Sequence, residues 1–353
     1  MSAIDRRRYE VVPIAIARDG RWYVEPHALT KLPRLTAKLG GLTRGTLAVD
    51  LAPYPDGRRL RAGAAAKRRT GSAGMLRQLD VVFPVLHGSF GEDGTIQGLL
   101  ELAQVPYVGA GILGSAIGMD KDAQKRLLGA AGIPTVRYRA LDRADYEADP
   151  KSAARDAQEL GYPVYVKPNA LGSSVGVSRV TSAAGLRRAI DEAFRYDTRV
   201  LIEAACEGRE LECAVLGNER PEASVVGEVV VGSSHRFYSY ESKYIDPSGA
   251  AIRIPADLPT SAGQRIRELA AAAFKALDLA GMARVDFLAS RDLGELFVNE
   301  VNTIPGFTEI SMFPKLWEAS GLPLPELIDR LIALALERQR SRAALETNYR
   351  PRA

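Results

Sequence analysis

The 353-residue chain is 46% hydrophobic and 25% charged, a balance that supports a packed core and excludes disordered, fibrous and low-complexity proteins. Its 47 Lys and Arg against 43 Asp and Glu give a net charge of +4, but the short basic runs contain no interleaved aromatic residues, so no nucleic-acid interface is expected. Because there is no apolar stretch of about 18 residues and only two cysteines, Cys206 and Cys213, we expect a cytoplasmic protein without a membrane segment, disulfide framework or zinc site.

The N-terminal third alternates apolar runs with one helical pattern. Residues 10–17 and 81–86 read as buried strands, and residues 53–75, rich in Gly, Pro, Ala and Arg, as an exposed connection. A helix is expected from about Thr95 to Ala103, followed by a strand near Tyr107. Strands that alternate with helices at this spacing predict a parallel α/β sheet.

The remainder of the chain changes character near Leu211. Before it, we expect helices at 120–131 and 183–195 and strands at 164–167 and 200–203. After it come longer strands, which predict an antiparallel sheet with a flanking helix. These later elements are strands at 211–217, 225–231, 283–289 and 295–301, a helix at 260–279 and an amphipathic helix at 325–340.

A strand delivers Lys167 into the Gly- and Ser-rich run KPNALGSSVGVSRV. Backbone N–H groups at Gly172, Ser173 and Ser174 are suited to anionic oxygens, and the lysine adds a matching charge, so the run predicts a phosphate-binding loop. It is not a Walker A loop, because the lysine precedes the glycines. A flexible hairpin loop explains the same residues equally well.

Two later strands carry polar residues at alternate positions. Arg284 and Asp286 share one face of their strand, and Glu300 and Asn302 share one face of the other. If the strands pair as a hairpin, two carboxylates and an amide converge as an oxygen donor set suited to Mg²⁺. A half-exposed sheet with polar residues facing water is the alternative. The turn that follows could present the Gly306 N–H to the same face.

Two further loops have candidate functional residues. In LHGSFGEDGTIQG, His87 closes a strand ahead of Glu92 and Asp93, where ligands of open α/β sheets bind. The segment FYSYESKY contains Lys243 and Tyr244 and could form a lid over a reacting phosphoryl group. On their own, the histidine could equally be structural, and the aromatic loop is more typical of plain surface.

Together these motifs resemble the D-alanine–D-alanine ligase family of the ATP-grasp superfamily. HGSFGEDGTIQG, GSAIGMDK, KPNALGSSVG, FYSYESKY, ARVDF, NEVNTIPGFT and MFPKLWEASGL occur in the order and at the spacing of that family, over residues 9–338. The resemblance implies an ATP-grasp fold of mixed α/β and α+β class. Its segments would be an N-terminal parallel α/β domain at 1–112, a central ATP-grasp subdomain at 113–202, a C-terminal subdomain with the metal site at 203–342 and a polar tail at 343–353.

The same resemblance implies the reaction and its participants. ATP phosphorylates the carboxylate of one D-alanine, and the amine of a second D-alanine attacks the acyl phosphate, which supplies a precursor for peptidoglycan synthesis. ATP, two Mg²⁺ or Mn²⁺ ions and D-alanine are the expected ligands, in a cytoplasmic homodimer.

By match to the family motifs, each candidate residue takes a role. Lys121 and Lys167 would contact ATP phosphates with Ser174 nearby, Lys243 would reach the transferred phosphate from the lid, and Glu203 and Glu210 would hold adenine and ribose. Asp286, Glu300 and Asn302 would bind the two metal ions, and Arg284 with the Gly306 N–H would stabilise the oxyanion. Ser311 and the Met312 backbone would hold the second D-alanine, His87 and Glu92 would lie near the substrates, and Ser173 and Tyr244 would link the lid to the first substrate.

The start of the chain departs from the family pattern, which has a first strand, a Glu-His-Glu-Val-Ser segment and a helix that are not found here. Loss of an interior strand would expose sheet edges. Three explanations stay open: Met1 is an internal methionine, the chain is an impaired natural variant, or a partner or rearranged sheet compensates. A non-catalytic Mg-ATP-binding relic, or a ligase for another D-amino acid or D-lactate, is therefore the alternative function. Tyr244 favours the amide-forming enzyme over the D-lactate one.

Overall fold

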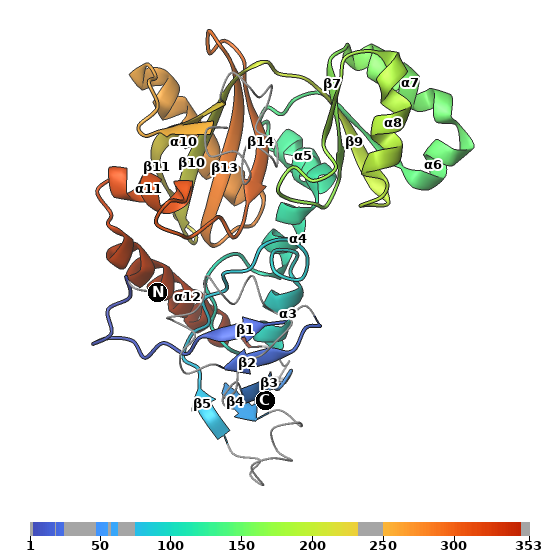
Figure 1. The fold of residues 1–353 in the computed structure, drawn as a ribbon. Coiled ribbons are helices and arrows are strands. Elements are labelled where there is room, and N and C mark those ends of the chain that lie inside the picture. The colour runs from blue at the N-terminus through green and yellow to red at the C-terminus, as the bar shows by residue number, and fades with distance from the viewer. Residues whose placement is uncertain are drawn as a thin grey trace, which may run out of the picture. The chain divides into compact units, whose positions relative to one another are not determined.

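The computed structural model describes residues 3–17, 19–24, 47–55, 58–62, 75–231 and 250–346 (Figure 1). The chain divides into two compact units. Unit 1 comprises Met1–Val82, Gly98–Tyr107 and Leu324–Ala353, and unit 2 comprises Phe83–Gln97 and Val108–Pro323. The domain boundaries expected from the sequence, after residues 112, 202 and 342, remain predictions.

Unit 1 contains a five-stranded sheet in which every neighbouring pair of strands is antiparallel. In sheet order the strands are β1 (Ile14–Ile16), β2 (Trp22–Val24), β3 (Leu47–Leu51), β4 (Arg59–Ala62) and β5 (Met75–Gln78). The alternation typical of a strand with one buried face is clear in β4, where Leu60 and Ala62 are buried and Arg59 is exposed.

The parallel sheet expected in this part of the chain is found among the described residues only as one bridge, between Val82 and Tyr107. Within the predicted strand at 10–17, only Ile14–Ile16 is a strand, and it pairs with β2 across a short turn that includes Gly20 at φ 82°. Parallel pairing needs a crossover of a dozen or more residues, so such a turn permits only antiparallel pairing. The expected irregular connection at 53–75 is also corrected, because β4 lies within it.

Two helices supply charged contacts in unit 1. The buried side chains of α12 (Leu324–Ala343) follow helical spacing, as its amphipathic pattern predicted. The Arg338 guanidinium donates to the Tyr107 backbone carbonyl at 3.0 Å and lies 4.4 Å from the centre of the Tyr107 aromatic ring. Arg342 pairs with Glu101, near the end of α3 (Thr95–Leu102). The end of α12 is therefore fixed to the segment around Tyr107 by cation–π and ionic contacts.

Unit 2 contains two sheets, and the first is a four-stranded antiparallel sheet in the order β6-β9-β7-β8. Its strands are β6 (Tyr138–Asp142), β7 (Val164–Pro168), β8 (Ser178–Val180) and β9 (Arg199–Ala204), and its helices are α6 (Arg143–Ala148), α7 (Pro150–Leu160) and α8 (Ala183–Ala193). Helices α7 and α8 contact this sheet (Figure 1) and bury Ala157 and Ile190 against Val164 and Ile202. The expected strands at 164–167 and 200–203 and the helix at 183–195 are confirmed.

The second sheet of unit 2 is also antiparallel, in the order β12-β11-β10-β13-β14. Its strands are β10 (Gly208–Gly217), β11 (Glu222–Val231), β12 (Ala250–Arg253), β13 (Gly281–Ser290) and β14 (Leu296–Asn302). Helix α10 (Thr260–Ala276) contacts β10, β11 and β13, where Phe274 joins a core that includes Leu211, Val285 and Phe287. Helix α11 (Met312–Ala319) contacts β10 and β11. This confirms the antiparallel sheet and flanking helix expected from residue 211 onward.

Helices α4 (Ile112–Met119) and α5 (Lys121–Ala130) follow one another directly. Asp120 accepts a hydrogen bond from the Ala123 N–H at 2.8 Å and so caps the start of α5. Both helices contact β14, the edge strand of the second sheet. Helix α5 is therefore placed between the two sheets of unit 2, with its N-terminal end tied to the loop after β7 by the Lys121 N–H, which donates to the Asn169 carbonyl at 3.2 Å.

Candidate active site

Polar side chains cluster on one face of the second sheet, where three strands lie side by side. The register aligns Glu212 of β10 with Asp286 of β13, and Asp286 with Glu300 of β14. Arg284 stands opposite Asn302 two positions further along, on the same face. Because successive strand residues alternate faces, the buried Val285 and the residues at either side of it point in opposite directions. The hairpin expected through Ser290–Gly294 is confirmed, and it brings the predicted donors together.

Arg284 is the centre of this cluster. Its guanidinium binds Asp286 through two hydrogen bonds, from Nε to Oδ1 at 2.7 Å and from Nη2 to Oδ2 at 2.8 Å. Its Nε also lies 2.9 Å from Oε2 of the buried Glu212, and the Asn302 amide donates to Asp286 Oδ2 at 2.9 Å. Burial opposes the charge of Arg284, but Asp286 and Glu212 outweigh it and raise its pKa. The guanidinium is therefore a fixed positive charge beside the carboxylates.

Lys121 joins this cluster from the first turn of α5. Its ammonium donates to the Leu171 carbonyl at 2.7 Å and lies 4.0 Å from Glu300 Oε2. The Asp122 N–H donates to the Asn169 side chain at 2.9 Å, which binds the same helix end to the loop after β7. Burial lowers the pKa of Lys121, partly offset by Glu300. A lysine, a helix N-terminus and a Gly- and Ser-rich loop are thus assembled at one place, an arrangement suited to phosphate.

A second ionic cluster is almost completely buried. Glu203 of β9 lies between two lysines, with Oε2 2.7 Å from Lys167 Nζ and Oε1 3.2 Å from Lys125 Nζ. Burial alone would raise the pKa of Glu203, but the two lysines outweigh burial and lower it. Burial lowers the pKa of Lys125, and Glu203 compensates only in part. Glu203 and Lys167, assigned to different ends of ATP by the resemblance, are direct partners in this structure.

The loop after Lys167 has an unusual backbone. Ser173 and Ser174 both have positive φ, 57° and 56°, which costs a non-glycine residue about 1–2 kcal/mol each. Gly176 follows at φ 72°, and a Cβ there would lie 2.9 Å from Pro168 Cγ, so the close packing requires glycine. Strained backbone at a loop of this composition is typical of ligand sites. The phosphate role of this loop stays a prediction.

The loop before α3 is closed by its own acidic residues. Glu92 accepts from the Gly88 N–H at 2.6 Å, and Asp93 accepts from the Thr95 N–H at 3.0 Å. Asp93 therefore caps α3, whereas Glu92 also has a hydrogen bond with the backbone of Ile304, two residues after β14. Burial is the main cause that raises the pKa of Glu92. The structure thus places this loop near the residues that follow β14, and its role as a substrate loop stays a prediction.

Gly306 and Ser311 lie close together after β14. A Cβ on Gly306 would stand 2.9 Å from Ser311 Oγ, so glycine is needed for this approach. Ser311 Oγ accepts from the Thr308 N–H at 3.1 Å and orders the turn that leads into α11. Met312 begins α11 and is buried. The turn therefore brings Gly306, predicted to stabilise the oxyanion, close to Ser311, predicted to bind the second D-alanine.

Several predicted residues are not part of these contacts. Lys243 and Tyr244, with the rest of 237–244, lie outside the described residues. Glu210 is on β10 opposite Leu288, two positions from Glu212. Conversely, sequence reasoning missed Gln124, Lys125 and Glu212. Their only sequence signals are spacing, since Gln124 and Lys125 follow Lys121 at i+3 and i+4, and Glu212 follows Glu210 at i+2.

The oxygen donors fit a hard divalent cation in chemical type, because Asp286, Glu300 and Asn302 offer two carboxylates and an amide from paired strands. Within the described residues, no group of three or more His, Cys, Asp or Glu side chains could hold a metal ion. Asp286 is also engaged by Arg284 and Asn302. A metal at this site would therefore share its coordination with non-protein oxygens, as Mg²⁺ bound to a nucleotide does.

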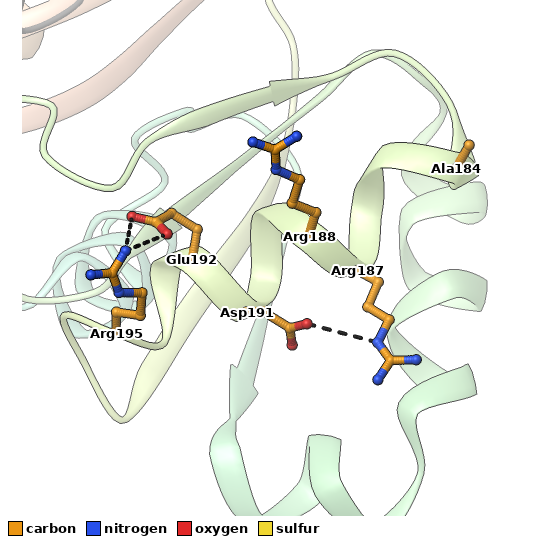
Figure 2. A pocket seen from close by; sticks show the side chains of 6 residues that line it. All are labelled: Ala184, Arg187, Arg188, Asp191, Glu192 and Arg195. Atoms are coloured by element: carbon orange, nitrogen blue, oxygen red, sulfur yellow. Dashed lines mark hydrogen bonds and ion pairs between the residues drawn. The ribbon is translucent and has the colours of Figure 1, made fainter.

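A hollow of about 440 Å³ on the surface of α8 is unrelated to these clusters (Figure 2). Apart from Ala184, its lining consists of charged residues of α8 and of Arg195, just after that helix, and the ion pairs Arg187–Asp191 and Arg195–Glu192 account for most of them. Such pairs are typical of a solvated helix face.

In the described part of the chain, no helix is both long and apolar enough to span a membrane.

Two family models match the chain. One, described as D-ala D-ala ligase N-terminus, covers residues 1–110, and the other, described as D-ala D-ala ligase C-terminus, covers residues 127–333. A curated relative, D-alanine–D-alanine ligase A of Bradyrhizobium diazoefficiens, is 47% identical over 347 residues, which is 98% of this chain and 91% of the relative.

Solved structures show the same likeness. A D-alanine–D-alanine ligase from Coxiella burnetii is 37% identical with a TM-score of 0.79, over 97% of this chain and 88% of that chain. The VanG D-Ala:D-Ser ligase from Enterococcus faecalis is 34% identical with a TM-score of 0.82, over 95% of this chain and 92% of that chain. The ATP-grasp fold expected from the sequence is confirmed by these neighbours.

Proposed function

The chain belongs to the D-alanine–D-alanine ligase family, and we propose that it uses ATP to join two D-alanines into D-alanyl-D-alanine for peptidoglycan synthesis. The observation that carries this proposal is the convergence, on the face of one sheet, of Arg284, Asp286 and Glu300 with Lys121. A cationic guanidinium, a cationic ammonium and two carboxylates within contact distance form the kind of site that phosphoryl transfer from a nucleotide needs.

In the first half of the reaction, the carboxylate of one D-alanine attacks the γ-phosphate of ATP, which forms an acyl phosphate and releases ADP. Lys121 and Lys167 would hold phosphate oxygens, together with backbone N–H groups near Ser174. Asp286, Glu300 and Asn302 would hold two Mg²⁺ or Mn²⁺ ions, which would neutralise charge on the phosphates. To hold a phosphate oxygen, the Lys167 ammonium would bind phosphate and Glu203 at the same time, because it forms an ion pair with one oxygen of Glu203. The other oxygen of Glu203 forms an ion pair with Lys125. Glu210 is assigned to the ribose end, and Glu203 to the adenine end, by resemblance to the family.

In the second half, the amine of the second D-alanine attacks the acyl phosphate, so the amide forms as phosphate leaves and the nitrogen loses a proton. The Gly306 N–H and Arg284 would stabilise the oxyanion that develops, and removal of one such donor typically costs about 3 kcal/mol of the barrier. Arg284 suits this role because its charge is permanent and its position is fixed by Asp286 and Glu212. Because the charge is permanent, Arg284 can stabilise the oxyanion without transferring a proton to it.

The substrate positions follow the same motif match. Ser311 and the Met312 backbone would hold the carboxylate of the acceptor, and their place beside Gly306 supports this. His87 and Glu92 would lie near the donor, and Ser173 with Tyr244 would connect it to the lid, from which Lys243 reaches the transferred phosphate. We also propose a cytoplasmic location and a homodimer, on the ground of family resemblance.

A competition among acceptors tests the product assignment. The protein is incubated with Mg-ATP and D-alanine alone, and then with equal amounts of D-alanine and either D-serine or D-lactate at neutral pH, and the products are separated by mass. We expect D-alanyl-D-alanine as the main product in every mixture. A main product that contains D-serine, or an ester of D-lactate, would assign the acceptor site to a different ligase within the same family.

A further inference from the structure

Gln124 is a buried polar residue to which the reaction described above gives no role. It lies on α5 at i+3 from Lys121, so the two side chains leave the same side of the helix. Only 1% of Gln124 is exposed. A glutamine is rarely buried to this extent unless its amide is fully hydrogen-bonded, and a buried amide left unpaired costs about 1–3 kcal/mol.

The Gln124 amide binds the backbone of Val301 in β14, the strand with the proposed metal ligands Glu300 and Asn302, and the backbone of Gly118. Its Oε1 accepts from the Val301 N–H at 3.0 Å, and its Nε2 donates to the Val301 carbonyl at 3.3 Å. The same Nε2 donates to the Gly118 carbonyl at 2.7 Å, in the last turn of α4. One carboxamide therefore binds both polar groups of Val301 and the helix that precedes α5.

Val301 lies between Glu300 and Asn302 in an edge strand. On one side β14 pairs with β13, and on the other no strand among the described residues pairs with it. The carboxamide of Gln124 takes the place of a neighbouring peptide group there, because it offers one acceptor and one donor, as a strand residue does. An edge strand held on both sides has less freedom to shift along or away from the sheet.

From these contacts we infer that Gln124 is a positioning residue, which fixes the backbone between Glu300 and Asn302 relative to α5 and Lys121. The inference rests on the proposed function, since that function makes Glu300 and Asn302 metal ligands. It adds a physical link between the two halves of the phosphate site. Helix α5, which has the proposed phosphate-binding Lys121, is joined through the Gln124 amide to β14, which has the proposed metal ligands. Partners that orient metal ligands typically contribute 10–100-fold to metal affinity.

The test substitutes Gln124 by Met, which keeps the length and volume of the side chain but has no strong donor or acceptor. Binding of Mn²⁺ is followed by the electron paramagnetic resonance signal of the free ion, in the presence of a non-hydrolysable ATP analogue. We expect Mn²⁺ to bind at least about tenfold more weakly to Q124M than to the wild type. In turnover, the Mg²⁺ concentration for half-maximal rate should rise more than kcat falls.

A matched control is Gln97→Met in α3. Gln97 is also buried, 2% exposed, and its Nε2 donates to the Gly91 carbonyl at 2.9 Å, a residue that is not part of β14. Both variants should unfold at lower urea concentration, but only Q124M should lose Mn²⁺ affinity. Equal Mn²⁺ affinity in wild type and Q124M, with both variants equally destabilised, would overturn the inference. If Q124M does not fold, Gln124→Glu retains the acceptor for Val301 N–H and loses both donors, and it should show the same loss of Mn²⁺ affinity.

The proposed function can fail separately. A wild-type protein that binds Mn²⁺ with the nucleotide but releases no phosphate with D-alanine would refute the ligase activity, while the comparison of Q124M with Q97M would still decide the role of Gln124.

Discussion

The buried cluster of Lys125, Glu203 and Lys167 allows a quantitative prediction. Glu203→Gln removes one negative charge and leaves two ammonium groups in a space where both lysines are at most 9% exposed. At an effective dielectric constant of 20, attraction over 3.2 Å and 2.7 Å amounts to about 5 and 6 kcal/mol. Desolvation of the three groups cancels much of this attraction. The change in the free energy of unfolding is therefore set mainly by the buried charge that the substitution leaves unpaired.

We therefore expect Glu203→Gln to lower the free energy of unfolding by about 3–5 kcal/mol. Lys125→Met should cost less, about 1–3 kcal/mol, because Glu203 keeps Lys167 as its partner and an expensive buried charge is removed. The double variant should be more stable than the sum of the two single effects predicts, by about 2 kcal/mol.

Urea unfolding at pH 7 measures these free energies, with the slope of the transition as a check that each variant unfolds to the same extent. The pH dependence has a definite sign. Because the pKa of Glu203 is lowered from 4.5, its contribution is present above pH 4.5 and is lost as pH falls through the folded pKa, so the gap between wild type and Glu203→Gln should narrow in acid. Additive single effects, or a gap that widens in acid, would refute the reasoning.

Three further predictions concern single residues. Gly306→Ala places a Cβ 2.9 Å from Ser311 Oγ, so the KM of the acceptor D-alanine should rise about 10- to 100-fold while the KM of ATP changes little; equal changes in both would contradict this. Burial raises the pKa of Glu92, so the stabilising contribution of its protonated form is present below pH 4.5 and is lost as pH rises. Glu92→Gln should therefore unfold at a higher urea concentration than wild type at pH 7 and at the same concentration in acid. A variant that is less stable than wild type at pH 7 would show that burial is not the cause. Burial raises the pKa of the Cys213 thiol to about 12, so a thiol reagent at pH 8 should leave it unmodified in the native protein and reach it only after denaturation, and rapid native labelling would show that the strand opens.

Elements with strong local signals could be predicted from the sequence. The hairpin of β13 and β14 follows from two alternating strands joined by a turn, and the faces that carry Asp286 and Glu300 follow from the same alternation. Helices α5, α8 and α10 were found from their spacing. The motif match then assigned functions to residues that pattern alone left undecided, as with the oxygen donors on the hairpin.

The missed features depend on tertiary packing. Lys121, Gln124 and Lys125 share a helix face that resembles an ordinary solvated face, and only the structure shows that all three are buried. Their burial is possible because residues of other elements pair with them: Glu300 with Lys121, Glu203 with Lys125, and the Val301 backbone with Gln124. The antiparallel sheet of unit 1 was missed for a related reason, since short apolar runs do not reveal whether a hairpin or a crossover joins them.

The measurement that tests the central claim most directly is phosphate release from Mg-ATP by this chain, with D-alanine as substrate and L-alanine as the control. The account predicts release that requires D-alanine and is accompanied by D-alanyl-D-alanine in equal amount. Folded protein that binds Mg-ATP but releases no phosphate with D-alanine, or releases it equally with L-alanine, would contradict the account.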